Sequence, residues 1–257
     1  MAARGLRFDR FYSGAALCAP TRGSVMTGRN ANRFGDFAPN WSIRPEEITV
    51  AALLRKRGYV NGYFGKWHLG PVRAGSPTNP GAMGFDEWLA HDNFYGHSAL
   101  LSRNGADPRR VNGESSEGVA REAVRFLKEQ AGAGKRTFTV LAFGSPHEPY
   151  TPTDDDIVPY HGKVSERLAE RFAEISAMDR AMGYLRDGIR EAGIAENTLV
   201  WFISDNGTPV PDRDRSPLRG AKGSYYEGGI RVPAIVEWPA RIRSPRRTGM
   251  RAVTSDI

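Results

Sequence analysis

The 257-residue sequence predicts an α/β fold in which a mostly parallel central sheet is flanked by helices on both faces. Expected strands and helices alternate along the chain, which is typical of this class. Residues 137–143 form an almost continuous apolar run, the pattern of a strand that is buried on both faces of a parallel sheet. Polar clusters follow three of the expected strands, and ligands of open α/β sheets bind at such strand ends.

The composition indicates a globular chain with one sizeable domain over residues 1–257 and many loops. Hydrophobic residues make up 40% of the sequence and charged residues 25%. The net charge is +7, but no basic run exceeds three residues or alternates with aromatic residues, so we expect no nucleic-acid partner. No apolar run approaches the ~20 residues of a membrane helix, so we expect no membrane contact.

The cellular compartment stays open at this stage. The first ten residues lack the apolar segment of a signal peptide. The chain has a single cysteine, which excludes only an intramolecular disulfide.

The first half of the chain predicts three regular elements. A strand is expected at 7–13, and a helix is expected from an N-cap at Thr49 to Gly58. A short strand then covers 59–64. Residues 71–114 are rich in Pro, Gly, Asn and Arg, and we expect mostly loop there.

The second half predicts two helices and two further strands besides the one at 137–143. The first helix is capped by Ser115 or Ser116, and its apolar face holds Val119, Ala123, Phe126 and Leu127. A long helix follows, with apolar residues at steps of three and four from Leu168 to Ile189, and Met178 and Met182 in that stripe are expected to fill the core. Strands are expected at 198–203 and 231–237, separated by a glycine-rich loop at 219–223.

Cys18 is the first candidate for chemistry. Pro20 suits the first turn of a helix and Gly28 suits its end, which places the Cys18 side chain at a helix N-terminus. Arg22 follows four residues later on the same helical face. Such a thiol would be acidified, and an oxyanion would be held there. An inert buried cysteine, with Arg22 in a surface ion pair, is an equally open interpretation.

Three other clusters follow expected strands. Lys66 and His68 leave the same face if the chain stays extended, although a tight turn with a packed histidine is the alternative. His147 lies between two prolines in a loop, where a lone histidine is more often structural. Asp205 and Asn206 are hard oxygen ligands suited to Ca²⁺ or Mg²⁺, but their sequence is also an ordinary turn.

These segments together resemble the sulfatase family. Cys18-Ala19-Pro20-Thr21-Arg22, followed by Thr27-Gly28-Arg29, is similar to the family's cysteine signature. Further similar segments are Gly65-Lys66-Trp67-His68-Leu69-Gly70, Ser145-Pro146-His147-Glu148-Pro149, Ser204-Asp205-Asn206-Gly207, and Lys222 with the string from Tyr226 to Pro233. The resemblance implies an alkaline-phosphatase-like fold and an N-terminal-type sulfatase catalytic domain, incomplete, over residues 1–257.

The resemblance also implies a mechanism. Cys18 would be converted to formylglycine by a formylglycine-generating enzyme, and the aldehyde hydrate would be the nucleophile. Ca²⁺ or Mg²⁺ would be bound by Asp205, Asn206 and residue 18. The implied catalytic residues are Cys18, Arg22, Lys66, His68, His147 and Lys222.

In this scheme Lys66 holds the hydrate and His68 removes a proton from it. His147 and Lys222 contact the sulfate and the leaving oxygen, while Arg22 neutralises charge on the sulfuryl oxygens. The implied substrate is a small aryl or sugar sulfate, with its identity set by loops such as 71–114.

The sequence departs from the family pattern at both ends. No Asp-Asp pair precedes Cys18, and the first strand and the C-terminal subdomain of the family are missing, which suggests a truncated chain. We therefore expect weak metal binding and little activity of this chain, and a longer parent could be periplasmic or secreted. Two alternatives stay open: a phosphonate or phosphate monoester hydrolase on the same scaffold, and an inactive anion- or glycan-binding remnant.

Overall fold

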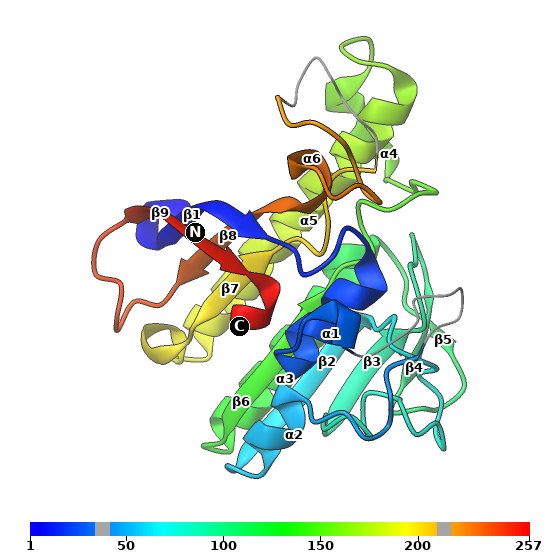
Figure 1. Ribbon diagram of the computed structural model, residues 1–257. Coiled ribbons are helices and arrows are strands. Elements are labelled where there is room, and N and C mark those ends of the chain that lie inside the picture. Colours follow the sequence, from blue (N-terminus) through cyan, green and yellow to red (C-terminus); the bar gives the residue numbers. More distant parts are fainter. Residues whose placement is uncertain (34–41, 210–216) are drawn as a thin grey trace. The chain divides into compact units, whose positions relative to one another are not determined.

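The computed structural model describes residues 1–33, 42–209 and 217–257. The chain divides into two compact units. Unit 1 comprises Met1–Val50 and Ile194–Ile257, and unit 2 comprises Ala51–Gly193. Each unit contains its own sheet (Figure 1), so the α/β class predicted from the sequence is confirmed, with mixed sheets.

The sheet of unit 1 has four strands in the order β7-β8-β1-β9. Strand β1 pairs in parallel with β9 and antiparallel with β8, and β8 pairs antiparallel with β7. The bounds are β1 Leu6–Tyr12, β7 Val200–Ile203, β8 Arg231–Glu237 and β9 Arg246–Val253. The sequence predicts β1, β7 and β8 to within two residues, but it does not predict β9.

The core of this sheet is built from apolar residues of its strands. Phe11 and Val232 are buried, and Phe8 and Trp201 pack against them. The rings of Phe8 and Trp201 are stacked with centroids 6.4 Å apart. The helical elements of unit 1 are α1 Cys18–Thr27, α6 Glu227–Ile230, and the short 3₁₀ turns Ala2–Arg4, Ala31–Arg33, Ala195–Asn197 and Thr254–Asp256.

The sheet of unit 2 has five strands in the order β5-β4-β3-β2-β6. Strand β2 lies in parallel between β3 and β6, whereas β3–β4 and β4–β5 are antiparallel. The bounds are β2 Tyr59–Lys66, β3 Glu87–His91, β4 Leu100–Arg103, β5 Arg109–Arg110 and β6 Arg136–Ala142. Most of 71–114 is loop, as predicted, but three short strands that the sequence does not predict extend the sheet within that segment.

The helices in and beside unit 2 are α2 Val50–Arg55, α3 Ser115–Gly132, α4 Asp154–Ile157 and α5 Glu166–Glu191, with a 3₁₀ turn at Val158–Tyr160. The predicted cap of α3 is wrong. Ser115 and Ser116 lie inside the helix, and the Glu114 carboxylate accepts the hydrogen bond from the Glu117 N–H at 2.9 Å. A carboxylate there also interacts favourably with the helix dipole. The predicted apolar face of α3 is buried.

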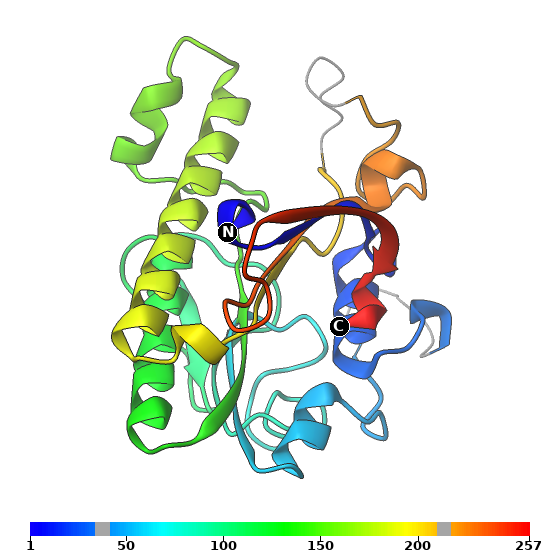
Figure 2. The same cartoon turned by 90° about the vertical axis from the view of Figure 1, so that its left-hand side faces the viewer.

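Helix α5 packs beside α3 in unit 2 (Figure 2). Its buried residues are mainly alanines, at Ala169, Ala173, Ala177 and Ala181, whereas Met178 and Met182 are only partly buried. The prediction that these methionines fill the core is therefore only partly right. Small residues let the helices approach closely, since a Cβ at Gly188 would lie 2.5 Å from the Val124 side chain.

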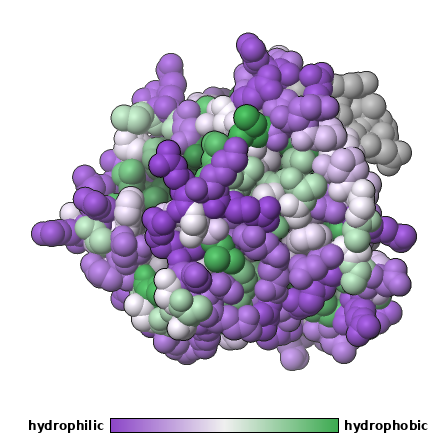
Figure 3. Space-filling model, turned by 90° about the horizontal axis from the view of Figure 1, so that it is seen from below, coloured by the Kyte–Doolittle hydropathy of each residue, from purple (hydrophilic) through white to green (hydrophobic). Residues whose placement is uncertain are grey.

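No helix of the described residues is long and apolar enough to cross a membrane. Hydrophilic side chains prevail on the face shown in Figure 3, and hydrophobic ones are scattered over it.

Gly65→Ala is expected to destabilise the protein by about 2–4 kcal/mol. Gly65 has φ of 112°, and a Cβ there would lie 1.9 Å from the Ala142 carbonyl oxygen on β6. Urea unfolding followed by circular dichroism measures the effect. Gly183→Ala is the control, because a Cβ meets nothing within 4 Å there and alanine favours a helix. Equal stability of the two variants would contradict the prediction.

Candidate active site

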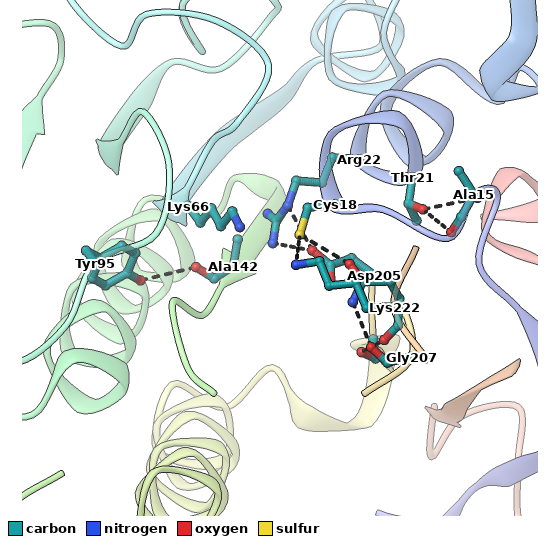
Figure 4. Close-up of polar contacts among 12 residues, drawn as sticks. Ala15, Cys18, Thr21, Arg22, Lys66, Tyr95, Ala142, Asp205, Gly207 and Lys222 are labelled. Carbon is teal, nitrogen blue, oxygen red and sulfur yellow. Dashed lines mark hydrogen bonds and ion pairs between the residues drawn. The ribbon is translucent and has the colours of Figure 1, made fainter. Parts of the chain in front are cut away.

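The Cys18 thiol is the centre of a polar cluster in unit 1 (Figure 4). Cys18 is the first residue of α1 and is 6% exposed. The Lys222 ammonium donates a hydrogen bond to Sγ at 3.1 Å, and Sγ donates to the Asn206 Oδ1 at 3.2 Å. The structure thus brings together three of the residues that the sequence singles out, from segments up to 204 residues apart.

The start of α1 is fixed by its approach segment. Leu17 is extended, with φ of −138°, and helical geometry begins at Cys18. The Thr21 hydroxyl donates to the Ala15 carbonyl at 3.0 Å and accepts from the Ala15 N–H at 3.2 Å. Leucine offers no side-chain acceptor at the cap, so no cap side chain satisfies the N–H groups of the first turn, and such groups favour anions. The expected helix N-terminus at Cys18 is therefore present.

Arg22 pairs with Asp205 in a partly buried ion pair. The guanidinium Nε and one terminal nitrogen donate to Asp205 Oδ2 at 3.1 and 2.9 Å. The two side chains are 15% and 26% exposed, so the pair is shielded from solvent rather than an ordinary surface pair. With Arg22 balanced by Asp205, the Lys222 ammonium and the helix N-terminus leave a net positive field beside the sulfur, which suits an anion.

The loop carrying Lys222 is tied to both neighbouring segments. The Lys222 N–H donates to the Thr208 carbonyl at 2.8 Å, and the Gly223 N–H donates to the Ala16 carbonyl at 2.9 Å. Gly207 follows Asn206, and a Cβ at Gly207 would lie 1.9 Å from the Gly228 carbonyl oxygen. This close approach requires glycine, and it holds the segment after β7, which carries Asp205 and Asn206, against α6.

Asp205 and Asn206 have the right ligand chemistry for a divalent cation, but two side chains are too few to complete its coordination. Their oxygens are the hard donors that Ca²⁺ prefers, and Ca²⁺ takes about six to eight of them. Among the described residues, no group of three His, Cys, Asp or Glu side chains gathers at one point. The sequence-based metal assignment of Asp205, Asn206 and Cys18 thus corresponds to a cluster with two oxygen-bearing side chains.

Lys66 and His68 lie at the end of β2 in unit 2. Lys66 is the last residue of the strand and is 2% exposed. The expectation that both side chains leave an extended segment is wrong, because His68 has φ of 55° and the strand ends before it. The backbone N–H groups of Trp67 and His68 instead donate to His91 and Asp92 carbonyls at 2.9 Å each, which fixes the turn.

His147 lies in the loop after β6, and its ring is fixed from two sides. Its Nδ1 lies 2.6 Å from the Glu148 carbonyl oxygen, which can only accept a hydrogen bond. Nδ1 therefore carries a proton, and Nε2 is the nitrogen through which the ring would exchange one. The Phe94 ring stacks on the imidazole with centroids 4.5 Å apart and planes 10° apart.

The sequence predicts that three polar strand ends share one edge, and the structure places two of them at one edge of the same sheet. Strands β2 and β6 are parallel neighbours, with Gly65 opposite Ala142, so the segments carrying Lys66 and His147 leave the same edge. Asp205 follows β7, which belongs to the sheet of unit 1. Sequence reasoning missed Phe94, which stacks on His147, and Tyr95. The Tyr95 hydroxyl donates a hydrogen bond to the Ala142 carbonyl at 3.2 Å. Adjacent aromatic residues were the available signal in a segment expected to be loop.

Comparisons with known proteins point to one family. A family model described as Sulfatase matches residues 1–256. The N-acetylgalactosamine-6-sulfatase of Canis lupus familiaris is 31% identical over 96% of this chain and 52% of its own length. Human arylsulfatase A is 30% identical over 94% of this chain and 54% of its own length.

Solved structures show the same fold. The crystal structure of Ps i-CgsB in complex with k-i-k-neocarrahexaose superposes with a TM-score of 0.91 at 24% identity, covering 99% of this chain and 62% of that one. A Vibrio parahaemolyticus protein of the alkaline phosphatase superfamily gives a TM-score of 0.66 at 19% identity, covering 100% of this chain and 56% of that one. The chain spans about half the length of the curated relatives it matches. With the family model matching residues 1–256, the chain belongs to the sulfatase family.

Proposed function

We propose that this chain carries catalytic machinery of a sulfuric ester hydrolase that cleaves a sulfate monoester. The observation that carries the proposal is the environment of Cys18. A single buried cysteine opens a helix, and a lysine and an asparagine from distant segments both contact its sulfur. A cysteine that only filled the core would have no need of an ammonium group at 3.1 Å.

The proposal includes conversion of Cys18 to formylglycine by a formylglycine-generating enzyme. The hydrated aldehyde supplies one hydroxyl to attack sulfur and a second whose deprotonation expels sulfate. Sγ marks where the first oxygen of that group would lie. Lys222 would then donate to this oxygen and favour its anionic form, and Asn206 Oδ1 would accept from its hydroxyl and orient it.

The substrate's sulfate would be bound by positive groups around residue 18. Lys222, the first-turn N–H groups of α1 and the guanidinium of Arg22 are preorganised donors, and such donors stabilise charge that develops on oxyanions. Asp205 keeps the guanidinium in place through two hydrogen bonds. In the proposal Asp205 and Asn206 also supply ligands to Ca²⁺ or Mg²⁺, which would polarise the sulfate oxygens.

Lys66, His68 and His147 are assigned their roles from the family resemblance. Lys66 would hold the nucleophile, and His68 would remove the proton that releases sulfate. His147 would donate the proton to the leaving alcohol. The Nδ1–carbonyl contact supports this assignment, because it fixes the tautomer and makes Nε2 the exchanging nitrogen.

The proposed substrate is an aryl sulfate or a sulfated sugar, since similar proteins are named arylsulfatase, N-acetylgalactosamine-6-sulfatase and ulvan-active sulfatase. Hydrolysis of p-nitrophenyl sulfate, phosphate and phenylphosphonate esters tests the reaction class. We expect the highest kcat/KM for the sulfate. Preference for a phosphorus ester would favour the alternative of a phosphonate or phosphate monoester hydrolase. Anion binding without turnover, together with an unmodified thiol at position 18, would favour the inactive remnant.

Calcium binding by this 257-residue chain is expected to be weak, with a Kd above the micromolar range. The described part of the cluster offers carboxylate and amide oxygens from only Asp205 and Asn206, and Asp205 already pairs with Arg22. Isothermal titration with CaCl₂ measures the affinity, and Asn206→Ala is the control that removes one ligand. A sub-micromolar Kd would contradict the expected weak binding. Calcium binding that Asn206→Ala leaves unchanged would contradict this cluster as the site.

A further inference from the structure

The loop that carries His147 is attached to helix α5 by one buried carboxylate. Glu174 is 3% exposed and lies in the middle of α5. Its Oε1 accepts a hydrogen bond from the Thr151 N–H at 2.7 Å, four residues after His147. On the other side of His147, Ser145 lies close enough to Glu174 to favour its ionised form. The carboxylate is therefore hydrogen-bonded to the loop after the histidine and interacts electrostatically with the Ser145 side chain before it.

Thr151 extends this attachment to the segment that stacks on His147. Its hydroxyl accepts a hydrogen bond from the His97 N–H at 2.8 Å. A Cβ at Gly96 would lie 2.4 Å from that hydroxyl oxygen, so the Gly96 backbone is in close contact with the Thr151 side chain. Phe94, three residues before His97, stacks on the imidazole of His147. Both the ring's own loop and its stacking neighbour thus converge on Thr151.

The burial of Glu174 costs free energy that a residue needed only for packing would not cost. Its second oxygen, Oε2, is buried without a hydrogen-bond partner among the residues the structure describes. A buried carboxylate with so few partners costs several times more than an apolar side chain, and this helix elsewhere buries alanines. A cost of this kind points to a positional role.

We propose that Glu174 is a positioning residue for His147, holding the 144–151 loop and the Phe94 segment in place through Thr151. The catalytic consequence of this inference rests on the proposed function, because it assumes that His147 acts on the leaving group. The structural consequence, which is the anchoring of the loop, does not rest on it.

The anchor is expected to depend on pH near neutrality. The pKa of Glu174 is raised to about 7. Burial is the largest cause, and the carboxylates of Glu114 at the start of α3 and Glu170 on α5 act in the same direction, against the Thr151 and Ser145 contacts that lower the pKa. Tyr150 in the loop also faces this group, and burial raises its pKa. Arg171 on α5 acts in the opposite direction and lowers the pKa of Tyr150.

The direction follows from the hydrogen bond. The ionised carboxylate is the stronger acceptor for the Thr151 N–H, so the anchor is at full strength above pH 7 and weakens as Glu174 is protonated below it. A glutamine at 174 keeps an acceptor oxygen but loses the titration.

Amide hydrogen exchange of residues 144–153, followed by mass spectrometry and corrected for the intrinsic pH dependence of exchange, tests the anchor directly. We expect wild-type protection in this segment to be higher at pH 8 than at pH 6. Glu174→Gln should make protection independent of pH, and Glu174→Ala should speed exchange about tenfold at pH 8. Glu191→Gln is the matched control, since it removes an exposed carboxylate from the same helix, where it pairs with Lys128 and not with the loop, and should behave as wild type.

The kinetic arm uses p-nitrophenyl sulfate. Glu174→Ala should lower kcat about tenfold at pH 8 with a smaller change in KM, and Glu174→Gln should restore it and flatten the pH profile between 6 and 8. Absence of turnover in wild type would count against the proposed function and leave the exchange data to judge the anchor. Two results would overturn the inference. One is wild-type exchange at 144–153 that does not change with pH, and the other is exchange in Glu174→Gln with the same pH dependence as in wild type.

Discussion

Cys18→Ala is expected to lower kcat for sulfate monoesters by about 10⁴-fold or more, because it removes the precursor of the only proposed nucleophile. Lys222 and Asn206 would keep their positions but would have no reacting atom between them. Cys18→Ser separates attack from release. A serine hydroxyl can attack sulfur once, but it lacks the second hydroxyl whose deprotonation expels sulfate.

The serine variant should therefore accumulate one covalent sulfate per chain, measured as added mass on the intact protein after incubation with substrate. Its thermal unfolding should remain within about 1 kcal/mol of wild type, since Cys18 is small and its exchange for serine changes little volume. Turnover by Cys18→Ala within tenfold of wild type would contradict the assignment of position 18.

Lys222→Ala is expected to lower kcat/KM for the sulfate ester by about 10²–10³-fold. The Lys222 ammonium group lies 3.1 Å from Sγ. Backbone hydrogen bonds of Lys222 and Gly223 fix the loop that carries it. Lys222→Arg should recover part of the loss, because the charge returns while the reach and geometry of the donor change.

Lys128→Ala is the matched control for this experiment. Lys128 is an exposed lysine that pairs with Glu191 at 2.7 Å, and exposed pairs of this kind contribute little to stability. Its removal should leave kcat/KM within about twofold of wild type. If Lys222→Ala behaved like this control, the account of the Cys18 cluster would be wrong.

Periodic and apolar segments were predictable, whereas short and edge strands were not. The apolar run at 137–143 and the long helix after it correspond to β6 and α5. Strand β9 contains several arginines and a glycine, and it is an edge strand that needs no apolar pattern to pair with β1. Strand β3 has only five residues, between segments rich in glycine and proline.

The sequence identified residues of the candidate site more readily than the contacts between them. Motif resemblance selected Cys18 and Lys222, but their contact joins residues 204 positions apart, and no local pattern encodes it. Helical spacing placed Arg22 on the face of Cys18 and could not show that it pairs with Asp205. Glu174 gave no signal, because a glutamate within an amphipathic helix has the pattern of an exposed residue.

The chemical state of residue 18 tests the central claim most directly. Trypsin cleavage after Arg10 and Arg22 yields the peptide 11–22, which contains the only cysteine of the chain. Mass spectrometry of this peptide, from protein produced in its native host, distinguishes a thiol from an aldehyde. We predict the mass of the peptide in which the CH₂–SH group is replaced by an aldehyde. An intact thiol in all of the protein would contradict the claim that Cys18 becomes the nucleophile of a sulfatase.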